Sequence, residues 1–281
     1  MSERHHDPLT NADPDRVSYA TGTLLEANDF TAEQTYHRGR LAAALINIAG
    51  SGTIAGLDVV WTSADEATSE TEGAEEELRV HPGVAIDPSG RIIEVPRAAC
   101  IRLSRWFDEQ VALHPDDVTQ GYHGAPHNGV IVDLFIRFIA CPRGKTPAFA
   151  SGPYDALDAI APSRLRDSYE LKLVIRTDQI TPGDPKLPAS NWPSQNADLT
   201  TLQQAILQSY ESRATLQDHV PSTEDVNSVF LARLVIPATQ AVPNTETTLG
   251  SIPIRTADDV TVDKFSRRFV YSTAALAGWL L

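Results

Sequence analysis

The stretch VIVDLFIRFIA, residues 130–140, is the longest apolar run of the chain and decides its fold class. Successive side chains of a β-strand point to opposite faces. A period of two therefore gathers five apolar residues on one face: Val130, Val132, Leu134, Ile136 and Phe138. The other face is mixed, because Asp133 and Arg137 interrupt it. We expect a long strand with one face in a core, and Asp133 directed outward or paired with an arginine such as Arg137.

A hairpin is predicted on the N-terminal side of this strand. Residues 84–86 and 91–95 are apolar and flank Asp87-Pro88-Ser89-Gly90, in which proline and glycine favour a tight reversal. Further strands are expected over residues 57–62, 78–81, 98–103, 169–176, 229–236 and 252–254. Because strands outnumber helices and hairpins or irregular loops join them, the sequence predicts a mainly β fold with helices (α+β), arranged as a β-sandwich-like domain.

Helices are predicted at the periphery of this domain. The first begins at Thr31, which forms a capping-box pattern with Gln34, and runs for about 17 residues. Its apolar stripe is typical of a helix that packs on a core, and comprises Leu41, Ala44, Leu45 and Ile48. A short helix is expected from an N-cap at Ser104 to Leu113, followed by a loop over 113–128. Two helical insertions are predicted, at about 155–166 and 197–217.

The domain organisation is predicted from the two ends of the chain. Residues 1–16 are polar and broken by proline, which predicts a disordered arm. Residues 17–281 are expected to form a single domain with an apolar C-terminal segment, 260–281. That segment ends on Trp279, Leu280 and Leu281. Because an apolar end is unfavourable in water, it must pack against its own core or against a partner.

Composition and charge exclude several classes of partner. The 281 residues include 23 Lys and Arg against 37 Asp and Glu, a net charge of −14, so neither nucleic acid nor an anionic membrane surface is expected to bind. Seven acids lie between Asp65 and Glu77, which predicts a solvated loop; the Asp/Asn spacing of a calcium loop is missing. The longest apolar run is too short to insert into a membrane. Two widely spaced cysteines require no oxidising compartment, and a cytoplasmic location is expected.

No catalytic arrangement emerges from the sequence. His123 and His127 have the spacing of two ligands on a helix, but Gly124 and Pro126 oppose a helix there. The glycines of segment 50–56 follow a predicted helix and precede a strand, the reverse of a dinucleotide-binding loop. Serine nucleophile elbows do not occur. We therefore expect a protein that is not an enzyme and that uses no metal or cofactor.

Three stretches together resemble a known family. They are TGTLLEANDFTAEQTYHRGRL (21–41) leading into GSGTIAGLDV (50–59), the hairpin VHPGVAIDPSGRIIEV (80–95), and VFLARLVI (229–236) followed by VDKFSRRFVYSTAALAGWLL (262–281). In this order they resemble the N-terminal shoulder domain of the baseplate adaptor of type VI secretion systems. That shoulder is similar to those of phage receptor-binding proteins. The adaptor continues into further domains that meet a membrane complex, so only its baseplate-anchoring half is carried over.

The resemblance implies a structural role in a phage-tail-like contractile injection particle. The protein would be a baseplate or fibre adaptor that contacts other baseplate or tail proteins and forms a homo-oligomer, with a trimer favoured. Apolar residues near the two ends are the expected partner-binding positions: Leu24, Leu25, Phe30, Phe269, Trp279, Leu280 and Leu281.

Two alternatives stay open on the sequence. A carbohydrate- or receptor-binding module on the same scaffold would stack sugar rings on exposed tryptophans, namely Trp61, Trp106 or Trp192. A metal-dependent hydrolase would use His123 and His127 with Asp116 or Asp117.

Overall fold

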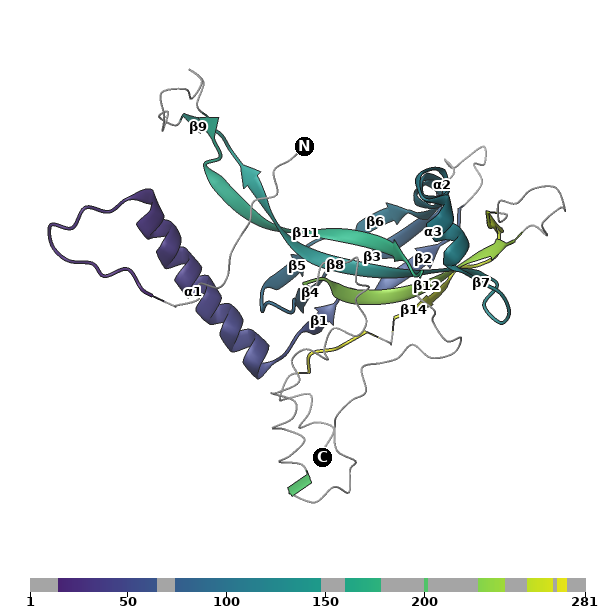
Figure 1. The fold of residues 1–281 in the computed structure, drawn as a ribbon, viewed down its shortest axis with the longest axis horizontal. Coiled ribbons are helices and arrows are strands. Elements are labelled where there is room, and N and C mark those ends of the chain that lie inside the picture. Colours follow the sequence, from purple (N-terminus) through teal and green to yellow (C-terminus); the bar gives the residue numbers. More distant parts are fainter. Residues whose placement is uncertain are drawn as a thin grey trace.

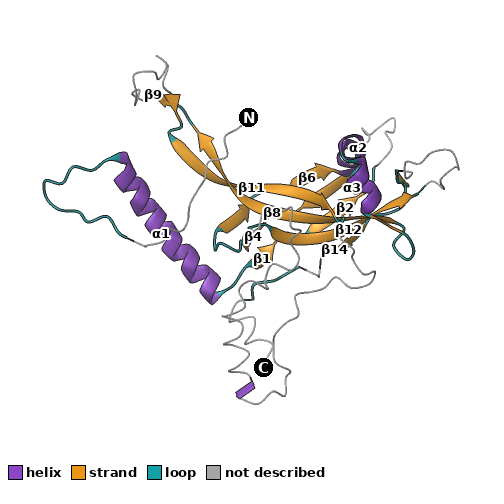
Figure 2. Cartoon of the chain, in the orientation of Figure 1, coloured by secondary structure: helices purple, strands orange, loops and turns teal. Residues whose placement is uncertain are grey.

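The computed structural model describes residues 15–64, 74–147, 160–177, 200–201, 227–240, 252–264 and 267–271. Within these ranges the chain forms several antiparallel sheets and three helices, shown in Figure 1 by position in the sequence and in Figure 2 by secondary structure. The predicted class, a mainly β fold with helices, is confirmed. The arm over residues 1–14 and the terminal residues 272–281 lie outside the described residues.

The largest sheet is built around β8 (Gly129–Arg143), the strand predicted from the apolar run. β8 lies between β11 (Arg164–Ile175) and β12 (Val229–Thr239), and both pairings are antiparallel. Shorter strands complete the sheet: β7 (Tyr122–His123) beside β8, and β13 (Ile254–Arg255) and β14 (Thr261–Asp263) beside β12.

Three smaller antiparallel sheets accompany it. The first contains β1 (Gly52–Gly56), β4 (Gly83–Ile86) and β5 (Ile92–Val95). The second contains β2 (Val59–Thr62), β3 (Glu77–Val80) and β6 (Ala99–Arg102). The third pairs β9 (Thr146–Pro147) with β10 (Ile160–Ala161). The predicted hairpin at 84–95 is therefore confirmed as β4 and β5.

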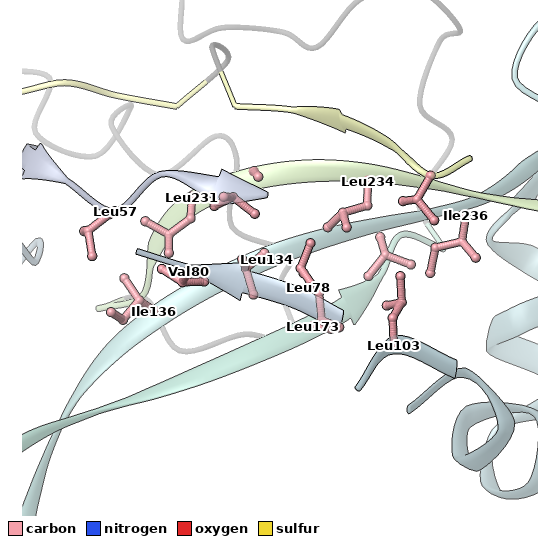
Figure 3. Close-up of a cluster of buried hydrophobic side chains, with 14 of the residues drawn as sticks. Leu57, Leu78, Val80, Leu103, Leu134, Ile136, Leu173, Leu231, Leu234 and Ile236 are labelled. Atoms are coloured by element: carbon pink, nitrogen blue, oxygen red, sulfur yellow. The ribbon is translucent and has the colours of Figure 1, made fainter. Parts of the chain in front are cut away.

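The hydrophobic core lies between the large sheet and the first two small sheets. Figure 3 shows Leu78 and Val80 of β3 close to Leu134 and Ile136 of β8. Leu231, Leu234 and Ile236 of β12 belong to the same buried cluster. This face of β8 is the one predicted to be apolar. The opposite face is also buried in the first half of the strand, at Ile131, Asp133 and Phe135.

The turn of the β4–β5 hairpin is held by the carboxylate of Asp87. This carboxylate accepts hydrogen bonds from the backbone N–H groups of Ser89 (2.9 Å) and Arg91 (2.8 Å) and from Nε of Arg91 (2.6 Å). Burial raises the pKa of Asp87 despite the opposing effect of Arg91. Gly90 has φ +86°, a left-handed conformation that glycine adopts without strain.

The helices differ in detail from the prediction. α1 spans Ala27–Ile48, because the carboxylate of Asp29 accepts a hydrogen bond (2.8 Å) from the backbone N–H of Glu26 and so caps an earlier first turn. The predicted start at Thr31 is wrong, since that residue lies inside the helix, where Oγ1 donates to the carbonyl of Ala27.

Two other predictions about helices are also wrong. α2 spans Leu103–Leu113, and Ser104 does not cap it, because its hydroxyl donates to Glu76 instead. The region predicted as a loop contains α3 (Pro115–Gln120), whose proline occupies the first turn, where the missing N–H removes no helical bond.

The predicted insertion at 155–166 is wrong over residues 160–166, which form β10, a two-residue connection and the start of β11. Continuous pairing of β11 with β8, from Arg164 opposite Arg143 to Ile175 opposite Val132, overrides local helix preference there. Residues 155–159 of this insertion, and the insertion at 197–217 apart from Thr200 and Thr201, lie outside the described residues.

Candidate functional site

An apolar surface along α1 and the segment before it is the candidate functional site. Leu24 is 84% exposed, and three residues of α1 are also exposed: Phe30 (51%), Leu41 (57%) and Ile48 (87%). We call these four residues the α1 surface. The predicted apolar stripe is thus wrong as a core-facing feature, because three of its four members, Leu41, Ala44 and Ile48, are exposed.

α1 is attached to the rest of the protein at a small contact. Of its 22 residues, only Ala42 is buried. Ala42 lies directly against the β4–β5 turn: a Cβ added at Gly90 would be 2.1 Å from the carbonyl oxygen of Ala42. In Figure 1, α1 extends away from the sheets to one side of the molecule. Because helices in proteins are stabilised mainly by tertiary packing of an apolar face, the exposed face of α1 lacks the packing that normally stabilises a helix.

The sequence-predicted partner-binding residues divide into three groups. Leu24 and Phe30 are exposed on the α1 surface, with Phe30 inside the helix, and Leu25 is half-buried. Phe269 is not exposed as an anchor: it forms a bridge with Thr53 of β1, and the Arg267 guanidinium lies 4.8 Å from its ring centre. The remaining three, Trp279, Leu280 and Leu281, lie outside the described residues.

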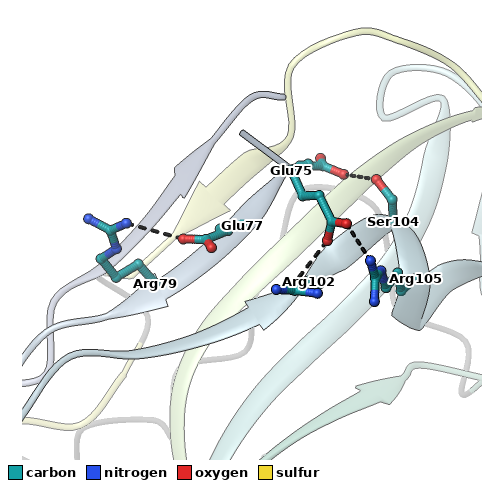
Figure 4. A network of polar contacts seen from close by, with 7 residues as sticks. Glu75, Glu77, Arg79, Arg102, Ser104 and Arg105 are labelled. Carbon is teal, nitrogen blue, oxygen red and sulfur yellow. Dashed lines mark hydrogen bonds and ion pairs between the residues drawn. The ribbon is translucent and has the colours of Figure 1, made fainter. Parts of the chain in front are cut away.

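A polar network occupies the end of the acidic run (Figure 4). Glu76 is only 5% exposed and accepts hydrogen bonds from the indole N–H of Trp61, the hydroxyl of Ser104 and the guanidinium of Arg255. Burial acts to raise the pKa of Glu76, but the bonds from Arg255, Ser104 and Trp61 together outweigh it and lower the pKa. The expectation that the whole acidic run is solvated is therefore wrong at Glu76.

The neighbouring glutamates form more exposed ion pairs. Glu75 contacts Arg102 (3.2 Å) and Arg105, and Glu77 contacts Arg79 (3.1 Å). Through Arg255 the network borders a shallow pocket of about 360 Å³. The pocket is lined by Phe107, Asp108, Val111, Ile252, Pro253, Ile254 and Arg255. The ionisable groups of the pocket are Asp108 and Arg255, and Arg255 is already paired with Glu76. These two groups do not supply the nucleophile and base that acyl transfer requires.

A second polar centre lies inside the large sheet. Asp133 is fully buried on β8 and forms ion pairs with Arg176 and Arg233, the latter at 2.7 Å. The prediction that Asp133 pairs with an arginine is therefore confirmed, but Arg137 is the wrong partner and the side chain is not directed outward. Arg137 instead pairs with Glu170 on β11. Asp133 and Arg233 lie opposite each other in the β8–β12 register, which explains why each interrupts an apolar strand.

The residues of the metal alternative do not form a centre. His123 lies on β7, Asp116 and Asp117 lie in the first turn of α3, and His127 lies in a turn where its backbone N–H donates to Gly124. Among the residues that the structure describes, no group of three His, Cys, Asp or Glu side chains could hold a metal ion.

Two of the three tryptophans of the carbohydrate alternative are not fully exposed. Trp61 and Trp106 are half-buried and pack against the hydrophobic core, and the indole N–H of Trp61 is bonded to Glu76. Trp192 lies outside the described residues.

The glycine-rich segment 50–56 serves backbone packing. A Cβ at Gly52 would lie 2.7 Å from the Arg268 carbonyl oxygen, and one at Gly56 would lie 2.1 Å from that of Pro82. These close approaches explain why glycine is needed at positions 52 and 56, so no phosphate ligand has to be invoked to explain these two residues.

Comparisons with known proteins add no further constraint. No protein-family model matches the chain, and a search of curated proteins finds no match. In the described part of the chain, no helix is long and apolar enough to cross a bilayer.

Several interacting residues were missed in the sequence. Glu76 lies in the acidic run and Arg255 in the two-residue strand β13, and neither segment carries a sequence signal for their pairing. The pair Asp133 and Arg233 did have a signal, because each is a charge inside an apolar strand, and two such charges in one core must neutralise each other.

Proposed function

We propose that this protein is a structural component of a phage-tail-like contractile injection particle, in which it acts as a baseplate or fibre adaptor through protein–protein contacts. The kind of particle is suggested by the sequence resemblance described above. The single observation that supports a contact role is the α1 surface, a set of large apolar side chains exposed on a helix that buries one residue. Large exposed apolar patches of this kind mark interaction sites.

The proposed adaptor works by geometry. The sheets form a body with a buried core, and α1 extends from it on a contact with the β4–β5 turn. Apolar anchors on α1 bind a partner, and the polar residues around them form the rim of the interface. The partners are other baseplate or tail-particle proteins and further copies of this chain. The net charge of −14 argues against nucleic acid, and we propose a cytoplasmic location before and during assembly.

The test is an affinity pull-down of the tagged full chain from its native host lysate, under conditions that keep contractile particles intact. We expect sheath, tube and baseplate proteins to copurify and to be identified by mass spectrometry and negative-stain microscopy. A double variant, Leu24→Asp with Leu25→Asp, is expected to lose these proteins while its circular dichroism stays that of the wild type. The matched control is Leu113→Asp, an apolar residue 62% exposed on α2. Recovery of the wild-type protein without any particle protein would contradict the proposal.

A further inference from the structure

Seven of the eleven exposed residues of α1 follow a heptad pattern. Starting at Ala27, exposed positions recur at alternating intervals of three and four: Ala27, Phe30, Gln34, His37, Leu41, Ala44 and Ile48. Residues spaced in this way share one side of a helix and form the contact line of a coiled coil. The pattern continues over the full 22 residues of α1, which is three heptads. We call these seven positions the α1 seam.

The α1 seam faces away from the body of the protein. Ala42, which contacts the β4–β5 turn, lies about 120° around the helix from Phe30, given the turn of 100° per residue. Gly39 lies about 180° from Phe30 by the same count. The side of α1 opposite the seam therefore includes the small residues Gly39 and Ala42, of which Ala42 contacts the body, whereas the seam residues are exposed.

We propose that the α1 seam binds the α1 seam of a second copy of this chain in an antiparallel pair. The charges of α1 are divided along its length, with Glu26, Asp29 and Glu33 in the first half and Arg38 and Arg40 in the second. Antiparallel packing lays each acidic half on the basic half of the other helix, whereas parallel packing would lay the two acidic halves side by side and bring opposite charges together only between Glu33 and the partner's Arg38. The partner occupying the surface is thus a second copy, selected by self-complementary charge.

The register follows from the seam. Glu33 and Arg40 each precede a seam position by one residue, and in the antiparallel pair Glu33 lies beside the partner's Arg40, and Arg40 beside the partner's Glu33. In the same register Phe30 packs on the partner's Leu41, and by symmetry Leu41 packs on the partner's Phe30, so this contact occurs twice in the pair. Gln34 meets the partner's His37 near the middle. Polar residues at such positions weaken a coiled coil but fix its register.

This inference rests on the proposed function in one respect, since both assign a contact role to α1. It replaces the trimer implied by the resemblance with a two-fold pair. The two can be tested separately, because self-association is measured on the purified full chain without any particle protein.

The experiment is sedimentation equilibrium of the untagged full chain over a wide range of concentration. We expect a reversible species of twice the chain mass. Leu41→Asp should weaken association at least about tenfold, because it places charge in the centre of the seam. Leu113→Asp, the control of similar exposure on α2, should leave association unchanged. A wild-type chain that stays monomeric at every concentration, or a species of three chain masses, would overturn the inference.

Charge exchange tests the antiparallel register. Glu33→Arg should weaken association because it places two arginines together, and adding Arg40→Glu in the same chain should restore it. In a parallel pair Glu33 would instead lie beside the partner's Arg38, so restoration by Arg38→Glu and not by Arg40→Glu would overturn the antiparallel arrangement. Particle proteins that copurify with a monomeric chain would leave the proposed function standing while this inference fails. If the chain forms a pair but no particle proteins copurify with it, this inference stands and the proposed function fails.

Discussion

β8 and α1 are the longest strand and the longest helix among the described residues, and they place their apolar side chains in opposite ways. In the first half of β8, from Gly129 to Ile136, every residue is buried, on both faces of the sheet. In α1, Ala42 alone is buried, while Phe30, Leu41 and Ile48 are exposed. The body therefore folds without the apolar face of α1, and that face is available for association.

The two regions also differ in how charge is used. In the sheet, Asp133 is neutralised by two arginines of the same chain, so its charge serves the fold. On α1, Glu33 makes only a long contact with His37 (3.7 Å), one turn further along the helix. A charged side chain without a close ion pair among the described residues of its own chain, such as Glu33, can select a partner. Substitutions in the body should accordingly change stability, and substitutions on α1 should change association.

The largest loss of stability is expected from Asp133→Ala. The substitution leaves Arg176 and Arg233 with little solvent and without their shared carboxylate, which should lower the free energy of unfolding by about 3–5 kcal/mol. The control is Glu170→Ala, which breaks the more exposed pair with Arg137 on the same strand pair and should cost less than about 1 kcal/mol. Urea denaturation measures both; equal losses would contradict the assignment of Asp133 as a buried centre.

A smaller and pH-dependent loss is expected from Glu76→Gln. Removing the charge weakens the hydrogen bonds from Arg255, Ser104 and Trp61, which should lower the free energy of unfolding by about 1.5–3 kcal/mol at pH 7. Because the folded pKa of Glu76 lies below the ordinary value of 4.5, its contribution is complete above pH 4.5 and is lost as the pH falls.

The difference between wild type and Glu76→Gln should therefore shrink below pH 4.5, as measured by urea denaturation across the pH range. Glu75→Gln is the control, since its pairs with Arg102 and Arg105 are exposed and should contribute little. A difference that grows on acidification would contradict the sign of the pKa shift.

Gly90→Ala should lower the free energy of unfolding by an amount comparable to or smaller than that of Glu76→Gln. The effect should be concentrated where α1 contacts the β4–β5 turn. The new Cβ would approach the Ala42 carbonyl oxygen to 2.1 Å at a positive φ, and should cost about 1–3 kcal/mol. Trypsin should then cleave faster after Arg38 and Arg40, because α1 is loosened from the β4–β5 turn. Gly124→Ala, where a Cβ meets nothing within 4 Å, should leave cleavage unchanged. Equal cleavage of both variants would show that this contact does not hold α1.

The strands and the hairpin could be predicted from the sequence because their signals are local. The alternation in residues 130–140 and the Asp87–Gly90 turn each depend on neighbours along the chain. The extension of β11 back to Arg164 could not be predicted in this way, since it depends on pairing with β8. The stripe of α1 was found, but its period alone does not distinguish a helix packed on its own core from one that packs on a partner.

The polar centres show the same limit. Asp133 was recognised as an interruption of the strand, and the nearest arginine in the sequence, Arg137, was the natural partner to expect. The actual partners come from β12 and from the residue after β11, and only the three-dimensional register brings them together. Leu24 and Phe30, which the sequence predicts as partner-binding residues, are exposed, whereas Phe269 packs against its own chain.

The central claim is that α1 carries association while the sheets carry stability. Amide hydrogen exchange of the purified full chain at low and high protein concentration tests it most directly. We expect exchange in residues 27–48 to slow as the concentration rises, exchange in residues 129–143 to stay constant, and Leu41→Asp to abolish the slowing. Concentration-independent exchange in α1, together with new protection in the sheets, would contradict the account.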